Sequence, residues 1–231
     1  MVKLSRFMSI AAVGLFICFC YIDARSEVVS VNTALKQKYD KCISGFNIDA
    51  IDLSSPKLKN KAGLLRNYFM CKAARNNSVS VCDKLPLEFA QMCRKYYQEY
   101  VDFIGMGLSK GPTSRGVERC MAFLADKSKC EDFLRGLNRK DSSVCGKVQG
   151  TQKEECEAQI LGKAGLCSST ACKQKADFVD AVRSRSMAKC NSLGNEMVVS
   201  ICKAYIGTSE SVCQDNPGYT AFKEIYCQDA Q

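Results

Sequence analysis

The chain has 231 residues, 46% of them hydrophobic, and a formal net charge of +9, which is typical of a folded globular protein and excludes a disordered polymer. It contains 16 cysteines, four prolines and no histidine. The absence of histidine excludes catalysis by Ser-His or Cys-His pairs and metal sites with histidine ligands.

Residues 1–24 predict a secretory signal peptide. Lys3 and Arg6 precede an apolar run at 7–22, and Ala24 offers a small residue for cleavage. The run is shorter than the ~20 apolar residues that span a bilayer. Cleavage would leave 14 cysteines and no Cys-x-x-Cys pair in an exported chain. We therefore expect a secreted or periplasmic protein with about seven disulfides, no metal, no cofactor and no transmembrane segment in the mature chain.

Residues 25–104 are expected to form an N-terminal helical part. Apolar residues recur at helical spacing in three windows, and the predicted helices lie within 34–46, 60–75 and 85–104. The last window carries an aromatic stripe, which either a core-facing helix or a ligand groove explains. Its members are Tyr96, Tyr97, Tyr100 and Phe103.

The most basic stretch of the chain lies in the same part, because no acidic residue occurs between Asp52 and Asp83. Its basic residues are Lys57, Lys59, Lys61, Arg66, Lys72 and Arg75. They predict a contact with an anionic partner. The alternative is a solvated helix face, balanced by acidic residues that folding brings near.

Residues 105–116 interrupt the helical pattern. This stretch has four glycines, one proline and several hydroxylated residues, a composition that favours a loop. Two interpretations fit it: a flexible hinge between two halves of the chain, and an exposed recognition loop.

Residues 117–231 predict a C-terminal cysteine-rich helical part. Its helical windows are shorter than those before it, apart from one helix expected to run from Cys172 to near Cys190. Alternation of apolar and polar residues over strand length is scarce throughout the chain. The sequence therefore predicts an all-α fold.

An internal repeat links the two parts. Residues 71–82 and 202–213 are identical at seven of twelve positions, and looser copies with the same Cys-x-Ala opening begin at Cys120 and Cys156. A straight helix would place cysteines eleven residues apart at about 16 Å, whereas a disulfide needs Cα atoms within roughly 7 Å. The chain must turn back inside each copy, so we expect irregular helical-hairpin repeats, arranged as a bundle or a short α-solenoid. In the first copy, Asn76-Asn77-Ser78 is the expected turn.

The repeat favours disulfides inside each copy. These pairs are Cys71–Cys82, Cys120–Cys130, Cys156–Cys167 and Cys202–Cys213. A rival scheme pairs neighbouring cysteines across the corners, including Cys82 with Cys93 and Cys145 with Cys156. Spacing satisfies both schemes and does not settle the connectivity.

These features favour a non-catalytic binding or structural role. The expected partner is a protein or an anionic envelope or surface component, and not a specific nucleic acid. The alternative is a carboxylate-dependent secreted hydrolase, for which Glu154, Glu155 and Glu157 are the densest acidic group. All three lie near the start of a predicted helix, where negative charge is favourable for structural reasons.

Overall fold

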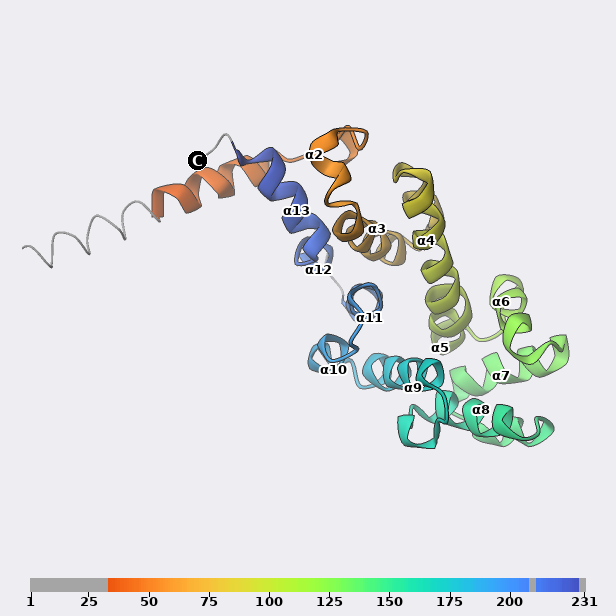
Figure 1. The fold of residues 1–231 in the computed structure, drawn as a ribbon. Coiled ribbons are helices and arrows are strands. Elements are labelled where there is room, and N and C mark those ends of the chain that lie inside the picture. Colours follow the sequence, from red (N-terminus) through yellow and green to blue (C-terminus); the bar gives the residue numbers. More distant parts are fainter. Residues whose placement is uncertain (1–32, 208–210, 229–231) are drawn as a thin grey trace, which may run out of the picture. The chain divides into compact units, whose positions relative to one another are not determined.

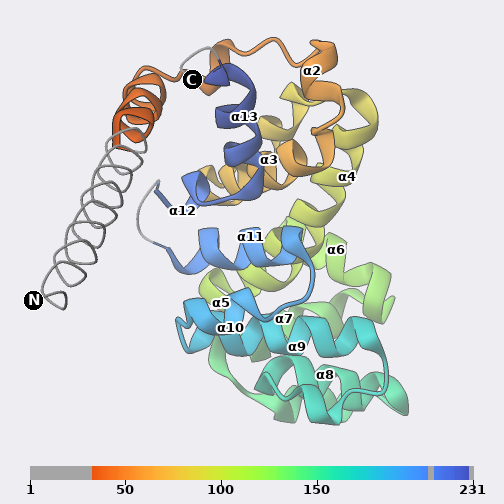
Figure 2. The ribbon, with the colours of Figure 1, turned by 60° about the vertical axis from the view of Figure 1, so that its left-hand side comes forward.

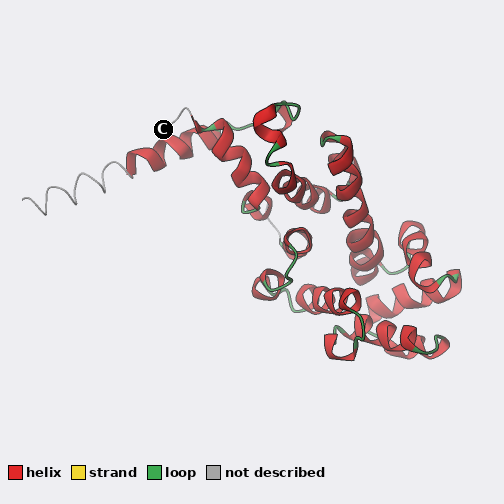
Figure 3. Ribbon diagram, viewed as in Figure 1, coloured by secondary structure: helices red, strands yellow, loops and turns green. Residues whose placement is uncertain are grey.

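The computed structural model describes residues 33–207 and 211–228 (Figure 1). The predicted signal peptide at 1–24 lies outside these residues. Every regular element in the described residues is helical (Figure 3), which confirms the all-α class. Over the same residues, no helix is both long enough and apolar enough to cross a membrane.

The described residues divide into two compact units. Unit 1 holds 33–51 and 223–228, and unit 2 holds 52–222. In unit 1, a helix at 33–44 is followed by η1 (Ile48–Ala50), a 3-10 turn. A disulfide between Cys42 and Cys227 joins the two segments of this unit covalently.

Unit 2 contains the other elements of the chain. In chain order these are α2 (Pro56–Lys59), α3 (Ala62–Asn76), η2 (Val79–Lys84), α4 (Leu87–Tyr97), η3 (Gln98–Gly105), α5 (Met106–Lys110), α6 (Ser114–Leu124), α7 (Lys127–Arg139), η4 (Ser142–Lys147), α8 (Thr151–Leu161), η5 (Ala164–Leu166), α9 (Thr170–Arg183), α10 (Met187–Asn191), α11 (Glu196–Ile206), α12 (Ser211–Gln214) and the first part of α13 (Pro217–Tyr226). The elements η2, η4 and η5 are 3-10 turns, whereas η3 is a π-helix.

Packing in unit 2 joins helices that are far apart in the sequence. Helix α8 packs on α9, α9 on α10 and α11, and α11 on α3 (Figure 2). From α3 the contacts continue through α4, η3 and α5 to α7, which returns to α8. The core along this closed path holds large side chains that are less than 2% exposed, including Phe69, Tyr97, Phe133 and Phe178.

Five corners between helices share one backbone plan. Each has a residue with φ between 48° and 67° after the end of a helix: Asn77, Ala125, Lys140, Gly162 and Arg185. A cysteine lies five residues after each of these: Cys82, Cys130, Cys145, Cys167 and Cys190. The turn expected at Asn76-Asn77-Ser78 is confirmed, with Asn77 in the left-handed conformation that ends many helices.

Small buried residues make these corners tight. In four of them, the amide after the left-handed residue donates a hydrogen bond of 2.9–3.1 Å to the carbonyl five residues earlier. The accepting residues are Ala73, Gly136, Ala158 and Ala181. A Cβ on Gly136 would lie 2.7 Å from Val144 Cγ2 and 2.8 Å from Ile160 Cδ1. The small residue thus lets the following turn pack against the end of the helix.

The disulfides correct the predicted connectivity. The Cys120–Cys130 bridge confirms one predicted pair, but Cys71–Cys82, Cys156–Cys167 and Cys202–Cys213 are wrong. The observed bridges are Cys42–Cys227, Cys82–Cys93, Cys120–Cys130, Cys145–Cys156, Cys167–Cys172 and Cys190–Cys202. The cause is where the segment after each corner packs. At four corners the cysteine lies on a short helical segment that packs against the next helix, so its bonding partner comes from that helix. These cysteines are Cys82, Cys145, Cys167 and Cys190.

Two cysteines of the internal repeat lie together instead. The sulfur atoms of Cys71 on α3 and Cys213 on α12 are 2.6 Å apart, and both residues are buried. The first cysteine of one copy therefore meets the second cysteine of the other. With the six bridges, this accounts for all 14 cysteines expected in the mature chain.

The predicted loop or hinge at 105–116 is wrong for most of its length. Residues 106–110 form α5, and α6 begins at Ser114. The glycines serve close packing: a Cβ on Gly107 would lie 2.9 Å from Leu134 Cδ2, and one on Gly116 would lie 2.7 Å from the Asp102 carbonyl oxygen. Composition signalled a break because glycine is common in turns, but here most of these glycines let helices approach one another.

The helix expected to reach Cys190 ends earlier. Helix α9 stops at Arg183, and the chain turns at Arg185, where φ is 48°. Helix α10 then carries Cys190, which places this cysteine beside α11.

Candidate functional site

The predicted basic stretch lies on α2 and α3. Lys57 and Lys59 are exposed on α2 and form no ion pair with acidic side chains of the described residues. The others are half-buried: Lys61, Arg66, Lys72 and Arg75. The Arg66 guanidinium contacts the Met92 sulfur at 3.2 Å, and that of Arg75 donates to the Gly207 carbonyl at 3.3 Å. Contact with an anionic partner stays a prediction for these residues.

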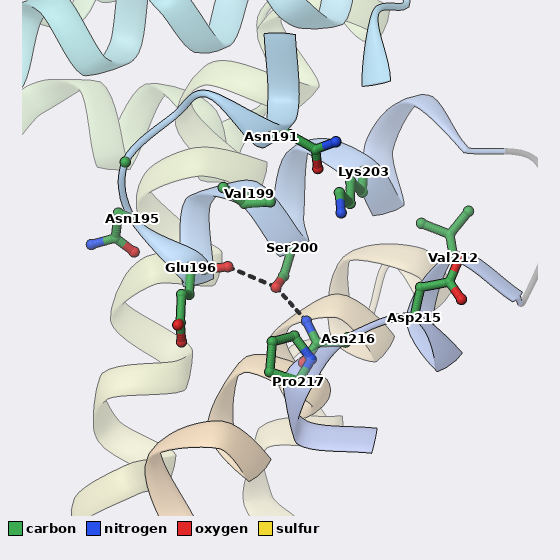
Figure 4. Close-up of a pocket in the computed structure, with 11 residues that line it drawn as sticks. Asn191, Asn195, Glu196, Val199, Ser200, Lys203, Val212, Asp215, Asn216 and Pro217 are labelled. Carbon is green, nitrogen blue, oxygen red and sulfur yellow. Dashed lines mark hydrogen bonds between the residues drawn. The ribbon is translucent and has the colours of Figure 1, made fainter. Parts of the chain in front are cut away.

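A cavity of about 380 Å³ lies where α10, α11, α12 and the start of α13 meet (Figure 4). Its lining is mixed, with amide, hydroxyl and charged side chains beside apolar surface. The apolar side chains are Val199, Val212 and Pro217. One basic and two acidic side chains also line it: Lys203, Glu196 and Asp215.

Buried polar side chains form one wall of this cavity. The Ser200 hydroxyl donates to the Glu196 carbonyl at 2.7 Å, and the Asn216 amide donates to the Ser200 oxygen (Figure 4). The Asn216 side-chain oxygen accepts from the Gly218 amide at 2.9 Å. Buried polar groups that satisfy one another fix the local geometry, so this wall is rigid.

The charged groups of the cavity differ in their partners. Glu196 accepts a hydrogen bond of 2.9 Å from the Asn67 side-chain amide. Asp215 is exposed. Lys203 is half-buried, and no acidic side chain within 33–207 or 211–228 forms an ion pair with it. The ammonium group of Lys203 is therefore available to a ligand.

A disulfide joins the two helices that carry Asn191 and Lys203. Cys190 on α10 precedes Asn191, and Cys202 on α11 precedes Lys203. The Cα atoms of the bonded cysteines are 5.6 Å apart. Asn191 and Lys203 both line the cavity (Figure 4). Covalent linkage of their neighbours limits how far these two residues can separate.

Helix α12 supplies another wall of the cavity. Val212 lines the cavity, and Cys213 holds α12 against Cys71 of α3. A Cβ on Gly207 would overlap Val212, so a glycine is needed where α11 ends beside α12. The cavity is thus framed by three short helices held near two cysteine pairs.

A second cavity of about 480 Å³ lies along α6 and α7. Val117 and Met121 give it an apolar side, while Glu118, Lys127 and Glu131 are charged. It contains a basic side chain, as the first does, but lacks amide side chains.

The aromatic stripe predicted on α4 and η3 belongs mainly to the core. Tyr97, Tyr100 and Phe103 are at most 3% exposed. The rings of Tyr96 and Tyr100 stack with centroids 6.4 Å apart. Burial raises the pKa of Tyr97 to about 12, with the Asp102 carboxylate as a second cause. These rings serve packing rather than a ligand groove.

Asp102 is a fully buried acidic side chain on η3. Its Oδ2 atom lies 3.3 Å from the Arg115 guanidinium. Burial raises the pKa of the Asp102 carboxyl, and Arg115 and Arg119 oppose this shift. Although π-helices often occur at functional sites, neither of the two cavities is lined by Asp102.

The three glutamates considered for hydrolysis lie on α8, and two of them contact other side chains. Glu155 accepts a hydrogen bond from the Ser169 hydroxyl, and Glu157 lies 4.0 Å from the Lys153 ammonium. Glu154 is exposed in the first turn. None of the three lines either cavity described above, so no observation favours the hydrolase alternative.

Sequence reasoning missed the residues of the α10–α13 cavity. Two signals could have found them. One is the cysteine that precedes each of Asn191 and Lys203, and the other is the asparagine before each of two helices, Asn195 before α11 and Asn216 before α13. Asn195 caps α11 by accepting from Met197 and Val198, at 3.0 and 3.3 Å. Among 33–207 and 211–228, no group of three His, Cys, Asp or Glu residues is placed to hold a metal ion.

No protein-family model, curated protein or solved structure matches the chain.

Proposed function

We propose that this is an exported, disulfide-linked helical protein that acts by binding rather than by catalysis, and that the α10–α13 cavity is its binding site. The observation that carries the proposal is the cavity of mixed polar and apolar lining beside the Cys190–Cys202 disulfide. Binding sites need side chains held by rigid elements. Here the disulfide, the buried Ser200–Asn216 pair and the close contact of α12 with α3 supply that rigidity.

Export is supported by the cysteine chemistry. Disulfides persist in oxidising compartments and are rare where cellular thiols keep cysteines reduced. Six bridges in one chain of this size are therefore best matched to a secreted or periplasmic location.

An anionic partner surface is a further part of the proposal. Lys57 and Lys59 are the members of the basic stretch that are exposed on α2. Replacing both with glutamate should weaken retention on an anionic polysaccharide, whereas replacing half-buried Arg66 and Arg75 should mainly disturb the fold. Retention unchanged by the double replacement would remove α2 from the proposed contact.

A fragment screen by NMR tests the cavity. Mature protein with intact disulfides is exposed to mixtures of small polar compounds, and backbone amide shifts are followed. We expect hits whose shifts concentrate at the ends of α10 and α11. Val199→Trp should abolish these shifts by filling the cavity, while Met121→Trp, which introduces the same side chain at the second cavity, should not.

Two results would contradict the proposed function. One is a set of hits whose amide shifts are unchanged by Val199→Trp, because the ligands would then bind elsewhere. The other is turnover of the bound compounds by the purified protein, which would make the cavity an active site.

A further inference from the structure

The charge of the cavity restricts what it can hold. Lys203 is its one basic side chain, and Glu196 and Asp215 are acidic. The two carboxylates oppose any added negative charge, and they oppose a ligand with two negative charges, such as a phosphate ester, twice as strongly. A half-buried ammonium without an acidic partner nevertheless favours one negative charge nearby. The cavity is therefore suited to a monoanion.

The remaining side chains suit a ligand rich in hydroxyl groups. Asn191 and Asn195 line the cavity. The Asn191 amide can both donate and accept, whereas the Asn195 oxygen caps α11 and leaves only the NH2 group of Asn195 to donate. Val199, Val212 and Pro217 add apolar surface at separate parts of the lining, where they can contact C–H groups of a ligand (Figure 4). Hydroxyls at the edge and C–H groups on the face are the combination that a sugar ring offers.

We infer that the α10–α13 cavity binds a hydroxylated monocarboxylate of the sugar-acid class, with the carboxylate on Lys203 and Asn191. This inference rests on the proposed binding function and names its ligand. Such an acid could be free in solution or could be the terminal residue of an acidic polysaccharide. The same carboxylate and hydroxyl groups are recognised in both cases.

Titration of the mature, oxidised protein with D-galacturonate tests the inference. Affinity is measured by calorimetry and the site by amide shifts. Three comparison ligands each differ from galacturonate in a stated feature. D-galactose has no charge, acetate has no hydroxyl groups, and galactose 1-phosphate carries a second negative charge. Galacturonate should bind at least about tenfold more tightly than galactose, because losing one charge-assisted hydrogen bond costs about that factor. It should also bind more tightly than acetate, which cannot use the amide side chains through hydroxyl groups, and than galactose 1-phosphate, which the two carboxylates repel more strongly.

Two lysine variants place the carboxylate. Lys203→Gln should weaken galacturonate binding by at least about tenfold and should remove its preference over galactose. Lys173→Gln is the matched control, since Lys173 is exposed on α9 and does not line the cavity. It should bind galacturonate as the unchanged protein does.

An oligomer separates the two sources of the ligand. Tighter binding of trigalacturonate than of the monomer supports a polysaccharide end, and tighter binding of the monomer supports a free sugar acid. Equal affinity for galactose and galacturonate, binding unaffected by Lys203→Gln, or no binding of galacturonate would overturn the inference. The proposed function would survive that result if other fragments still shift the cavity amides in a manner sensitive to Val199→Trp, and would fail if none does.

Discussion

Asp102 shows how one residue reports on the environment that the fold creates. Burial is the largest cause of the raised pKa of its carboxyl, and the opposing arginines do not cancel it. Between the ordinary value of 3.8 and the raised value, the folded protein binds more protons than the unfolded chain does. The contribution of Asp102 to stability therefore falls as pH rises through this window.

Asp102→Asn removes that titration. The free energy of unfolding of the variant, relative to the unchanged protein, should rise as pH increases from about 3 to 7 in urea denaturation. Asp141→Asn is the control with the opposite sign, because hydrogen bonds from Ser143 lower the pKa of Asp141. A relative stability of Asp102→Asn that is flat or falls with pH would contradict the buried, ionisable Asp102 described above.

Gly136 tests the close packing at the corners. An alanine Cβ there would lie 2.6 Å from the Asp141 carbonyl oxygen, and overpacking of this kind costs about 1–3 kcal/mol. Gly136→Ala should lower the free energy of unfolding despite the better helix propensity of alanine. Gly63→Ala on α3 meets no atom within 4 Å and should leave stability unchanged or raise it by up to about 1 kcal/mol. Similar effects of the two substitutions in chemical denaturation would contradict this account.

Some residue-level features were predictable and others were not. Asn77 was expected at a left-handed turn because asparagine tolerates that conformation. Ala125, Lys140 and Arg185 adopt the same conformation, but their residue types carry no such signal. At these positions the tertiary contacts of the corner override the local preference.

At the scale of elements, the disulfides fix pairs of neighbouring helices. The Cys190–Cys202 and Cys145–Cys156 bridges span similar separations of 12 and 11 residues. Replacing either pair with serine should lower the free energy of unfolding by about 2–4 kcal/mol, measured by denaturation without reductant. Only the loss of the Cys190–Cys202 disulfide should also weaken the binding of ligands in the α10–α13 cavity. Equal weakening by both variants would show that the bridge near the cavity has no local role.

Helices were predicted from the sequence more reliably than their connections. Apolar spacing located α3 and α4 because each buries one face or more. The prediction of a loop or hinge at 105–116 was wrong because glycine content does not distinguish a turn from the close approach of two helices. The favoured disulfides within the sequence copies were wrong apart from Cys120–Cys130, whereas the rival pairs Cys82–Cys93 and Cys145–Cys156 are confirmed. Pairing depends on which helix a short turn packs against, which spacing alone does not specify.

For the whole molecule, the fold class followed from composition and periodicity, but the cavity did not. Its residues come from α10, α11, α12 and the start of α13, and none of them forms a sequence motif. Only the packing of α12 beside α3 and of α10 beside α11 brings them together. The basic stretch was visible in the sequence, but its two arginines are engaged within the fold.

We propose that covalent sulfur links, most of them between consecutive helices, hold this all-α chain together outside the reducing cytosol. Peptide mapping of the native protein, alkylated at acidic pH without reduction, tests it directly. The account predicts the six bridges of the structure together with a Cys71–Cys213 crosslink, whose sulfur atoms lie 2.6 Å apart. Mostly alkylated cysteines, or crosslinks within the sequence copies such as Cys71–Cys82 and Cys202–Cys213, would contradict it.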